Sequence, residues 1–193
     1  MTSEKIRTFI AIKLAPEIIS SITRMQERLK GFGGRVKWVE PSNIHITLKF
    51  LGNITHEQLD KVIVATREAL RPFGSFDVSV SGLGTFPGKT SPRVIWIGIA
   101  EGKQELARLS KAIDKSLSKA GFPHERREFS PHLTLGRVKS SEGREGLTKA
   151  IASTDASNLG SVRVKRIVVM RSQLTPAGPI YTALEAVELI ANR

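Results

Sequence analysis

The tetrapeptides His45-Ile46-Thr47-Leu48 and His132-Leu133-Thr134-Leu135 are nearly identical, and the second follows the first by 87 residues. Each lies in a run of alternating polar and apolar residues, which is typical of a half-buried β-strand. Alternation puts the His and the Thr of each motif on one face of its strand. It adds Lys49 to that face and places Ile44, Ile46, Leu48 and Phe50 on the other. The chain has four histidines, and two of them in one repeated motif indicate an acid and a base for proton transfer to a phosphate or a carbonyl.

The same shift of 87 residues aligns other parts of the chain. It sets Ile6–Leu14 over Arg93–Ala100, two strand-like segments, and Pro16–Lys30 over Lys103–Leu117, two helical ones. It also sets Phe76–Gly84 over Arg163–Arg171. A repeat of about 90 residues is too long for a solenoid unit. The sequence therefore predicts two similar lobes, each of which supplies one histidine.

Length and composition predict one domain, residues 1–193, made of these two lobes. A chain of 193 residues can bury a substantial core. No apolar run approaches the roughly 20 residues of a membrane span, and the N-terminus lacks the apolar stretch of a signal peptide. We therefore expect a cytoplasmic protein without membrane contact. There is no cysteine, which excludes disulfides, thiolate metal sites and thiol catalysis.

The charge favours a polyanionic partner. Lys and Arg number 30 against 18 Asp and Glu, for a formal net charge of +12. Basic side chains bind phosphates and release condensed counterions. Between Asp155 and Glu185 there is no acid, while Arg163, Lys165, Arg166 and Arg171 are all present. The alternative interpretation of this cluster is an ordinary solvated basic surface.

Periodicity and turn signals predict the element order β-α-β-β-α-β-β-α-β-α-β-β. Helices are expected at 16–30, 55–70, 103–119 and 143–152, the second of them opened by a capping box of Thr55 and Gln58. The last two strands are expected at 162–174 and 181–189. Several strands follow one another through hairpin connections, which argues for an α+β fold with mixed or antiparallel sheets.

Four stretches together resemble the RNA 2',3'-cyclic phosphodiesterase family, whose members are also called 2'-5' RNA ligases, within the 2H phosphoesterase superfamily. They are HITLKF at 45–50, HLTLGR at 132–137, RTFIAI at 7–12, and Leu174-Thr175-Pro176 with Gly178–Tyr181. The resemblance covers essentially the whole chain. It implies a bilobal, duplicated α+β fold with a pseudo-twofold axis, two sheets facing a central cleft, and helices outside.

The chemistry of such a reaction suits the residues. Opening a 2',3'-cyclic phosphate requires the attacking water to lose a proton and the departing ribose oxygen to gain one. Imidazole, with a pKa of about 6.5, can do either near neutral pH. The Thr47 and Thr134 hydroxyls would bond the non-bridging oxygens. We expect no metal and no cofactor, since two histidines without a carboxylate cluster make a poor metal site.

The resemblance also implies individual roles. His45 corresponds to the general acid, which leaves a 2'-phosphate, and His132 to the general base; the sequence itself does not distinguish the two. Arg137 corresponds to an arginine that contacts the phosphate. Strict alternation puts Arg137 on the face of Leu133 and Leu135, unless a bulge at Gly136 turns it. Phe9 could stack on a base, although an apolar strand residue is more often part of the core.

The expected partner is RNA ending in a 2',3'-cyclic phosphate, with tRNA fragments as one candidate, acted on by a monomer that also catalyses reversible 2'-5' ligation. Two alternatives stay open at this point. One is a module that binds RNA ends or nucleotide phosphates without turnover, and the other is a 2H enzyme for a small cyclic nucleotide. His56 and His124 are predicted to be surface residues.

Overall fold

The computed structural model describes residues 4–88 and 91–191 and shows four α-helices and nine strands in the described part of the chain. In chain order they are β1 (Ile6–Lys13), α1 (Pro16–Lys30), β2 (Val36–Trp38), the 3-10 turn η1 (Pro41–Asn43), β3 (His45–Ile54), α2 (His56–Leu70), β4 (Phe76–Phe86), β5 (Val94–Ile99), α3 (Lys103–Lys119), β6 (His132–Val138), α4 (Arg144–Ser153), β7 (Ser161–Val164), β8 (Arg166–Leu174) and β9 (Pro179–Glu188). The order agrees with the expected one except that the strand predicted at 162–174 is divided at Lys165.

The strands form one strongly curved antiparallel sheet in the order β7-β4-β5-β6-β3-β1-β8-β9, and β2 pairs with the C-terminal end of β6 on the same edge as β3. Among the described residues, β3 and β6 meet at a single pair, Ile46 with Leu133. The two expected sheets are thus the two halves of this path, joined at its centre. Reading outward from the junction, β3, β1, β8 and β9 mirror β6, β5, β4 and β7, which is the expected pseudo-twofold arrangement.

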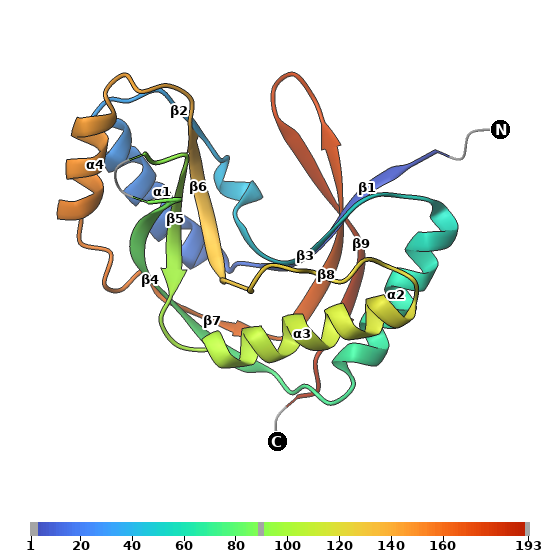
Figure 1. The fold of residues 1–193 in the computed structure, drawn as a ribbon. Coiled ribbons are helices and arrows are strands. Elements are labelled where there is room, and N and C mark those ends of the chain that lie inside the picture. The colour runs from blue at the N-terminus through green and yellow to red at the C-terminus, as the bar shows by residue number, and fades with distance from the viewer. Residues whose placement is uncertain (1–3, 89–90, 192–193) are drawn as a thin grey trace.

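Each lobe takes elements from both halves of the sequence (Figure 1). The lobe that contains β6, here the His132 lobe, also holds β2, β4, β5, β7, α1 and α4. The lobe that contains β3, here the His45 lobe, also holds β1, β8, β9, α2 and α3. The division at Lys165 follows from this exchange, because β7 pairs with β4 in one lobe and β8 pairs with β1 in the other.

The helices cover the outer faces of the two sheet halves with the apolar stripes that the periodicity predicts. In α1 the buried side chains are Ile18, Ile22, Met25, Gln26 and Leu29, and Pro16 stands at the start of the helix. Phe32, which the periodicity adds to this stripe, lies beyond the helix and is 55% exposed. At the start of α2 the predicted capping box is present, because Gln58 N–H donates to Thr55 Oγ1 and Gln58 Oε1 accepts from Thr55 N–H.

One continuous core fills both lobes, with Ile10, Ile46, Ile97, Leu106 and Leu133 among its fully buried members. Phe9, Ala11, Val168 and Met170 form a second, small cluster on the opposite face of β1 and β8, under Tyr181. None of the helices in the described part of the chain is long and apolar enough to cross a membrane.

Candidate active site

A cavity of about 620 Å³ lies over the junction of β3 and β6. Five of the six predicted site residues line it: His45, Thr47, His132, Thr134 and Arg137. Because the strands are antiparallel and pair at Ile46 and Leu133, His45 lies across from Thr134, and His132 lies across from Thr47. Two copies of one motif therefore place two imidazoles and two hydroxyls around a local twofold axis.

Both imidazoles are held in the same way. His45 Nδ1 lies 2.7 Å from the carbonyl oxygen of Asn43, and His132 Nδ1 lies 2.7 Å from the carbonyl oxygen of Ser130. A carbonyl oxygen can only accept, so Nδ1 carries the proton in both rings. Nε2 is therefore left as the atom that gains or loses a proton. In each lobe the residue two positions earlier fixes the tautomer, which the sequence motif alone does not reveal.

A β-bulge in each strand changes the alternation after the motif. On β6 the partner of Trp96 is Thr134 and the partner of Ile95 is Gly136, so Leu135 is the extra residue. On β3 the partners of Ala11 and Ile10 are Thr47 and Lys49, so Leu48 is the extra residue. The leucine of each HxTL motif is thus the bulge residue, buried in the core.

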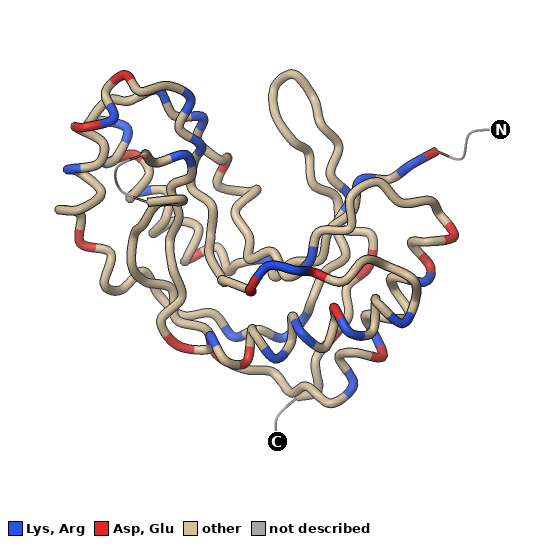
Figure 2. Tube along the Cα trace, in the orientation of Figure 1, with Lys and Arg blue, Asp and Glu red and all other residues tan. Residues whose placement is uncertain are grey.

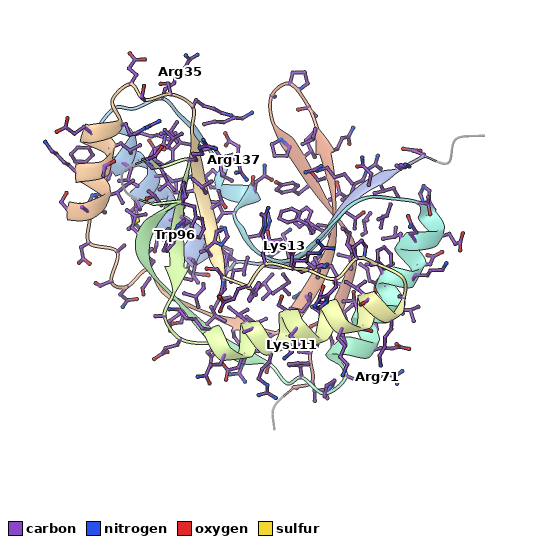
Figure 3. The ribbon with its side chains drawn as sticks, in the orientation of Figure 1. Lys13, Arg35, Arg71, Trp96, Lys111 and Arg137 are labelled. Carbon is purple, nitrogen blue, oxygen red and sulfur yellow. The ribbon has the colours of Figure 1, made fainter. Side chains whose placement is uncertain are left out.

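Because of the bulge on β6, Arg137 lines the cavity together with His132 and Thr134. A glycine at position 136 allows β2 to lie this close to β6, because a Cβ there would lie 2.7 Å from Val36 Cγ1 and 3.1 Å from Trp38 Cε3. Figure 3 shows Arg137 on the side of β6 that faces the β8–β9 hairpin.

The bulge on β3 overturns the expected faces of Lys49 and Phe50. Phe50 lines the cavity and is 62% exposed. Lys49 points away from it and is buried, with Nζ 2.6 Å from Asp114 Oδ1 on α3 and 2.9 Å from the Pro123 carbonyl oxygen. His124, predicted to be a surface residue, is exposed and contacts the other oxygen of Asp114. Alternation fails here because one extra residue in a strand exchanges its two faces.

Phe9 is not in the cavity wall, so the structure does not support its predicted stacking on a base. Its side chain is 2% exposed and its ring centroid lies 4.9 Å from that of His45. The ring centroid of Tyr181, on β9, lies 5.3 Å from that of His45, edge to face, and 5.0 Å from that of Phe9. Burial among these rings lowers the pKa of His45 below 6.5; the hydrogen bond to the Asn43 carbonyl opposes this shift, and the charge of His132 adds to it.

Sequence reasoning missed most of the remaining wall. Lys37 and Trp38 on β2, Asn43 in η1, and the hairpin residues Thr175 and 177–181 also line the cavity. Asn43 Nδ2 donates to the Pro179 carbonyl oxygen at 2.9 Å and so ties the hairpin to η1. Burial raises the pKa of Tyr181 above 10, against the opposing charges of Arg137 and Arg7. The signal that could have found Tyr181 is its place in the C-terminal stretch that carries the family resemblance.

The described residues contain no group of three or more His, Asp or Glu side chains placed to hold a metal ion.

Comparison with known proteins is consistent with the duplication. The model of the family described as LigT like Phosphoesterase matches twice, at residues 12–96 and 97–181. The RNA 2',3'-cyclic phosphodiesterase of Methanothermobacter thermautotrophicus is 38% identical over 185 residues, 96% of this chain and 100% of that protein. That of Methanocaldococcus jannaschii is 38% identical over 179 residues, 93% and 98% of the two chains.

Solved structures with the same fold include a protein of Thermus thermophilus, with a TM-score of 0.79, 28% identity, and coverage of 97% of this chain and 100% of the other. Another is E. coli LigT complexed with 3'-AMP, with a TM-score of 0.78, 25% identity, and coverage of 96% and 99%. With the two family matches spanning both halves, this chain belongs to the LigT-like phosphoesterase family.

Proposed function

We propose that this protein hydrolyses RNA ends that carry a 2',3'-cyclic phosphate and leaves a 2'-phosphate, with His45 as general acid and His132 as general base. The observation that carries the proposal is the pair of imidazoles that line one cavity, each with its Nδ1 proton bound to a backbone carbonyl. The names of the relatives support the substrate.

In this mechanism a water attacks phosphorus and gives its proton to His132 Nε2. The bond from phosphorus to the 3'-oxygen breaks, and that oxygen takes the proton from His45 Nε2. The products are a 2'-phosphate and a free 3'-hydroxyl. In 2'-5' ligation a 5'-hydroxyl takes the place of the water, so the same two groups serve, and their roles exchange in the reverse reaction.

The other cavity residues stabilise the phosphate. Thr47 and Thr134 lie beside the opposite histidines and donate to the non-bridging oxygens, and the Arg137 guanidinium compensates the negative charge that grows there. The lowered pKa of His45 leaves it neutral in the free protein at neutral pH. The bound phosphate anion raises that pKa, so His45 becomes protonated when the substrate is in place.

We further propose that the protein acts as a monomer, because one chain supplies both histidines, and that its substrates are cytoplasmic RNAs such as tRNA fragments. Phe9 acts on the reaction through His45, which it covers.

The test is to incubate an oligonucleotide ending in a 2',3'-cyclic phosphate with the protein in excess chelator and to identify the product. We expect a 2'-phosphate, and a loss of about 10²–10⁴-fold in His45→Ala and in His132→Ala. Failure of the wild type to turn over, combined with tight, salt-sensitive RNA binding, would favour a binding module.

A substrate with sulfur in place of the bridging 3'-oxygen assigns the acid. Sulfur leaves without a proton, so the loss in His45→Ala should largely disappear with this substrate while the loss in His132→Ala remains. The opposite pattern would exchange the two roles.

A further inference from the structure

Four basic side chains form a square array beside the cavity. Arg35 and Lys37 alternate along the chain into β2, and Arg137 and Lys139 alternate along the end of β6. Lys37 is the registered partner of Arg137, and Lys139 N–H donates to the Arg35 carbonyl at 2.7 Å, which continues the same ladder. All four are exposed, whereas Val36 and Trp38, at the alternate positions of β2, are half-buried and pack against the core.

In the described part of the chain, no ion pair balances the positive charge of this array. None of the ion pairs or side-chain hydrogen bonds found among the described residues involves any of the four. Like charges directly opposite each other on antiparallel strands destabilise the pairing. Four cations in two such rows therefore favour a bound anion with charges at a matching spacing.

The array begins in the cavity and leads out of it. Lys37 and Arg137 line the cavity wall, and Arg35 and Lys139 lie two residues farther along their strands. That step is about 6.7 Å at the usual rise of a strand. Successive phosphates of one nucleic-acid strand can match it, because they are separated by about 3.4 Å of rise in a stacked helix and by more when the strand is extended. Figure 2 shows blue segments following β2 and the adjoining end of β6.

The array exists on one lobe alone. The shift of 87 residues aligns Arg137 and Lys139 with Phe50 and Gly52 of β3, neither of which is basic. Across the cavity the array therefore faces an exposed aromatic ring, Phe50, and not a second array of the same kind. A substrate with a phosphate chain on one side of its reacting group fits this asymmetry.

We propose that Arg35, Lys37, Arg137 and Lys139, the cation ladder, bind the phosphates of a single RNA strand on the 5' side of the terminal cyclic phosphate. This rests on the proposed function and makes it more specific: the preferred substrate is an oligonucleotide, not a mononucleotide. Arg137 and Lys37 serve the reacting phosphate and its neighbour, and Arg35 with Lys139 serves the next phosphate upstream.

The experiment compares kcat/KM for a nucleoside 2',3'-cyclic phosphate and for a trinucleotide with the same terminal nucleoside. In the wild type the trinucleotide should be the better substrate. In Arg35→Gln/Lys139→Gln the ratio of the two values should fall by roughly tenfold, because two exposed cation–phosphate contacts are lost. The log–log salt dependence of trinucleotide kcat/KM should become shallower by about 0.7, because Arg35 and Lys139 together neutralise one phosphate.

The matched control is Arg71→Gln/Lys111→Gln, which removes one Arg and one Lys from the far side of the molecule (Figure 3). It should leave the ratio unchanged, which separates contact from the effect of net charge. A wild type that hydrolyses both substrates equally well, or a ladder variant that behaves like the control, overturns the ladder while the proposed function stands. A wild type that hydrolyses neither substrate overturns the proposed function itself.

Discussion

Each candidate catalytic histidine is fixed by the backbone that leads into its own strand. The carbonyl two residues before it accepts from Nδ1, at Asn43 for one ring and at Ser130 for the other. The surroundings of the rings nevertheless differ. His45 packs against the rings of both Phe9 and Tyr181, whereas His132 packs edge to face against Phe86, with the ring centroids 5.1 Å apart. The duplicated motif gives both histidines the same backbone hydrogen bond, and their different aromatic neighbours give them different environments.

We predict that the pKa of His45 lies below 6.5 in the free protein. Phe9→Leu should raise this pKa, because the smaller side chain reduces burial of the imidazole. The measurement is the chemical shift of the imidazole protons against pH by NMR. Phe86→Leu, which changes the ring beside His132 instead, should leave His45 unchanged.

The same shift has a consequence for stability. Because the pKa of His45 is lower in the folded than in the unfolded chain, the unfolded chain binds more protons at pH values between the two pKa values. The contribution of His45 to the free energy of unfolding is therefore complete above about pH 6.5 and is lost as pH falls through the folded pKa. The free energy of unfolding of the wild type should therefore decrease relative to His45→Gln over that range. A His45 that titrates at or above 6.5 would contradict both expectations.

At the scale of the elements, the paired bulges turn a simple alternating strand into a site. The positions of the two histidines and two threonines could be predicted from the sequence, because alternation holds up to the leucine of each motif. Beyond that leucine, the faces of Lys49 and Phe50 could not be predicted, because the position of an extra residue depends on how the strand pairs with its neighbour. Gly136 was the one residue in the sequence that indicated an irregular strand. The reason for a glycine there, the close approach of β2, is visible only in the structure.

A buried glutamine holds the bulge that aims Arg137. Gln26 Nε2, on α1, lies 2.9 Å from the Val39 carbonyl oxygen and 3.0 Å from that of the bulge residue Leu135. Gln26→Leu should leave the Val39 carbonyl unpaired at a cost of about 1–3 kcal/mol. Because Arg137 follows this bulge, KM for the cyclic phosphate should also rise severalfold. Thermal unfolding and steady-state kinetics measure the two effects.

The matched control is in the other lobe. Ser110 Oγ, on α3, donates to the carbonyl of the bulge residue Leu48 at 3.1 Å. Ser110→Ala should cost about 0.5–1.5 kcal/mol and leave KM near the wild-type value, since the residue beyond this bulge is Phe50. Equal changes of KM in the two variants would mean that Gln26 acts through general stability alone.

At the scale of the whole molecule, the repeat in sequence and the lobes in space are different divisions. The shift of 87 residues predicted two lobes with one histidine each, and it aligned elements that the fold relates by its pseudo-twofold axis. It could not show that α1 and β4 pack in the lobe of β6 while α3 and β8 pack in the lobe of β3. The same apolar faces would be buried whether each helix packed in the lobe of its own sequence half or in the other lobe. The hydrophobic pattern of the sequence therefore does not distinguish the two arrangements.

The exchange predicts that the two sequence halves fold only together. In residues 1–88 alone, β4 would lack its partners β5 and β7, and in residues 91–193 alone, β8 would lack β1. Each fragment should give a poorly dispersed NMR spectrum and no cooperative unfolding, and mixing them should restore both. A fragment that unfolds cooperatively on its own would show that the chain is not a single domain.

In the proposed mechanism, two imidazoles exchange protons with a cyclic phosphate across one cavity. The measurement that tests it most directly is kcat/KM against pH, in chelator, for the wild type, His45→Ala and His132→Ala. We predict a bell with its optimum within about one to two units of pH 6.5. His45→Ala should lose the fall on the alkaline side, and His132→Ala the fall on the acidic side, each with a rate about 10²–10⁴-fold lower. A wild-type rate that rises steadily to pH 10, or that depends on a divalent ion, would contradict the two-histidine mechanism.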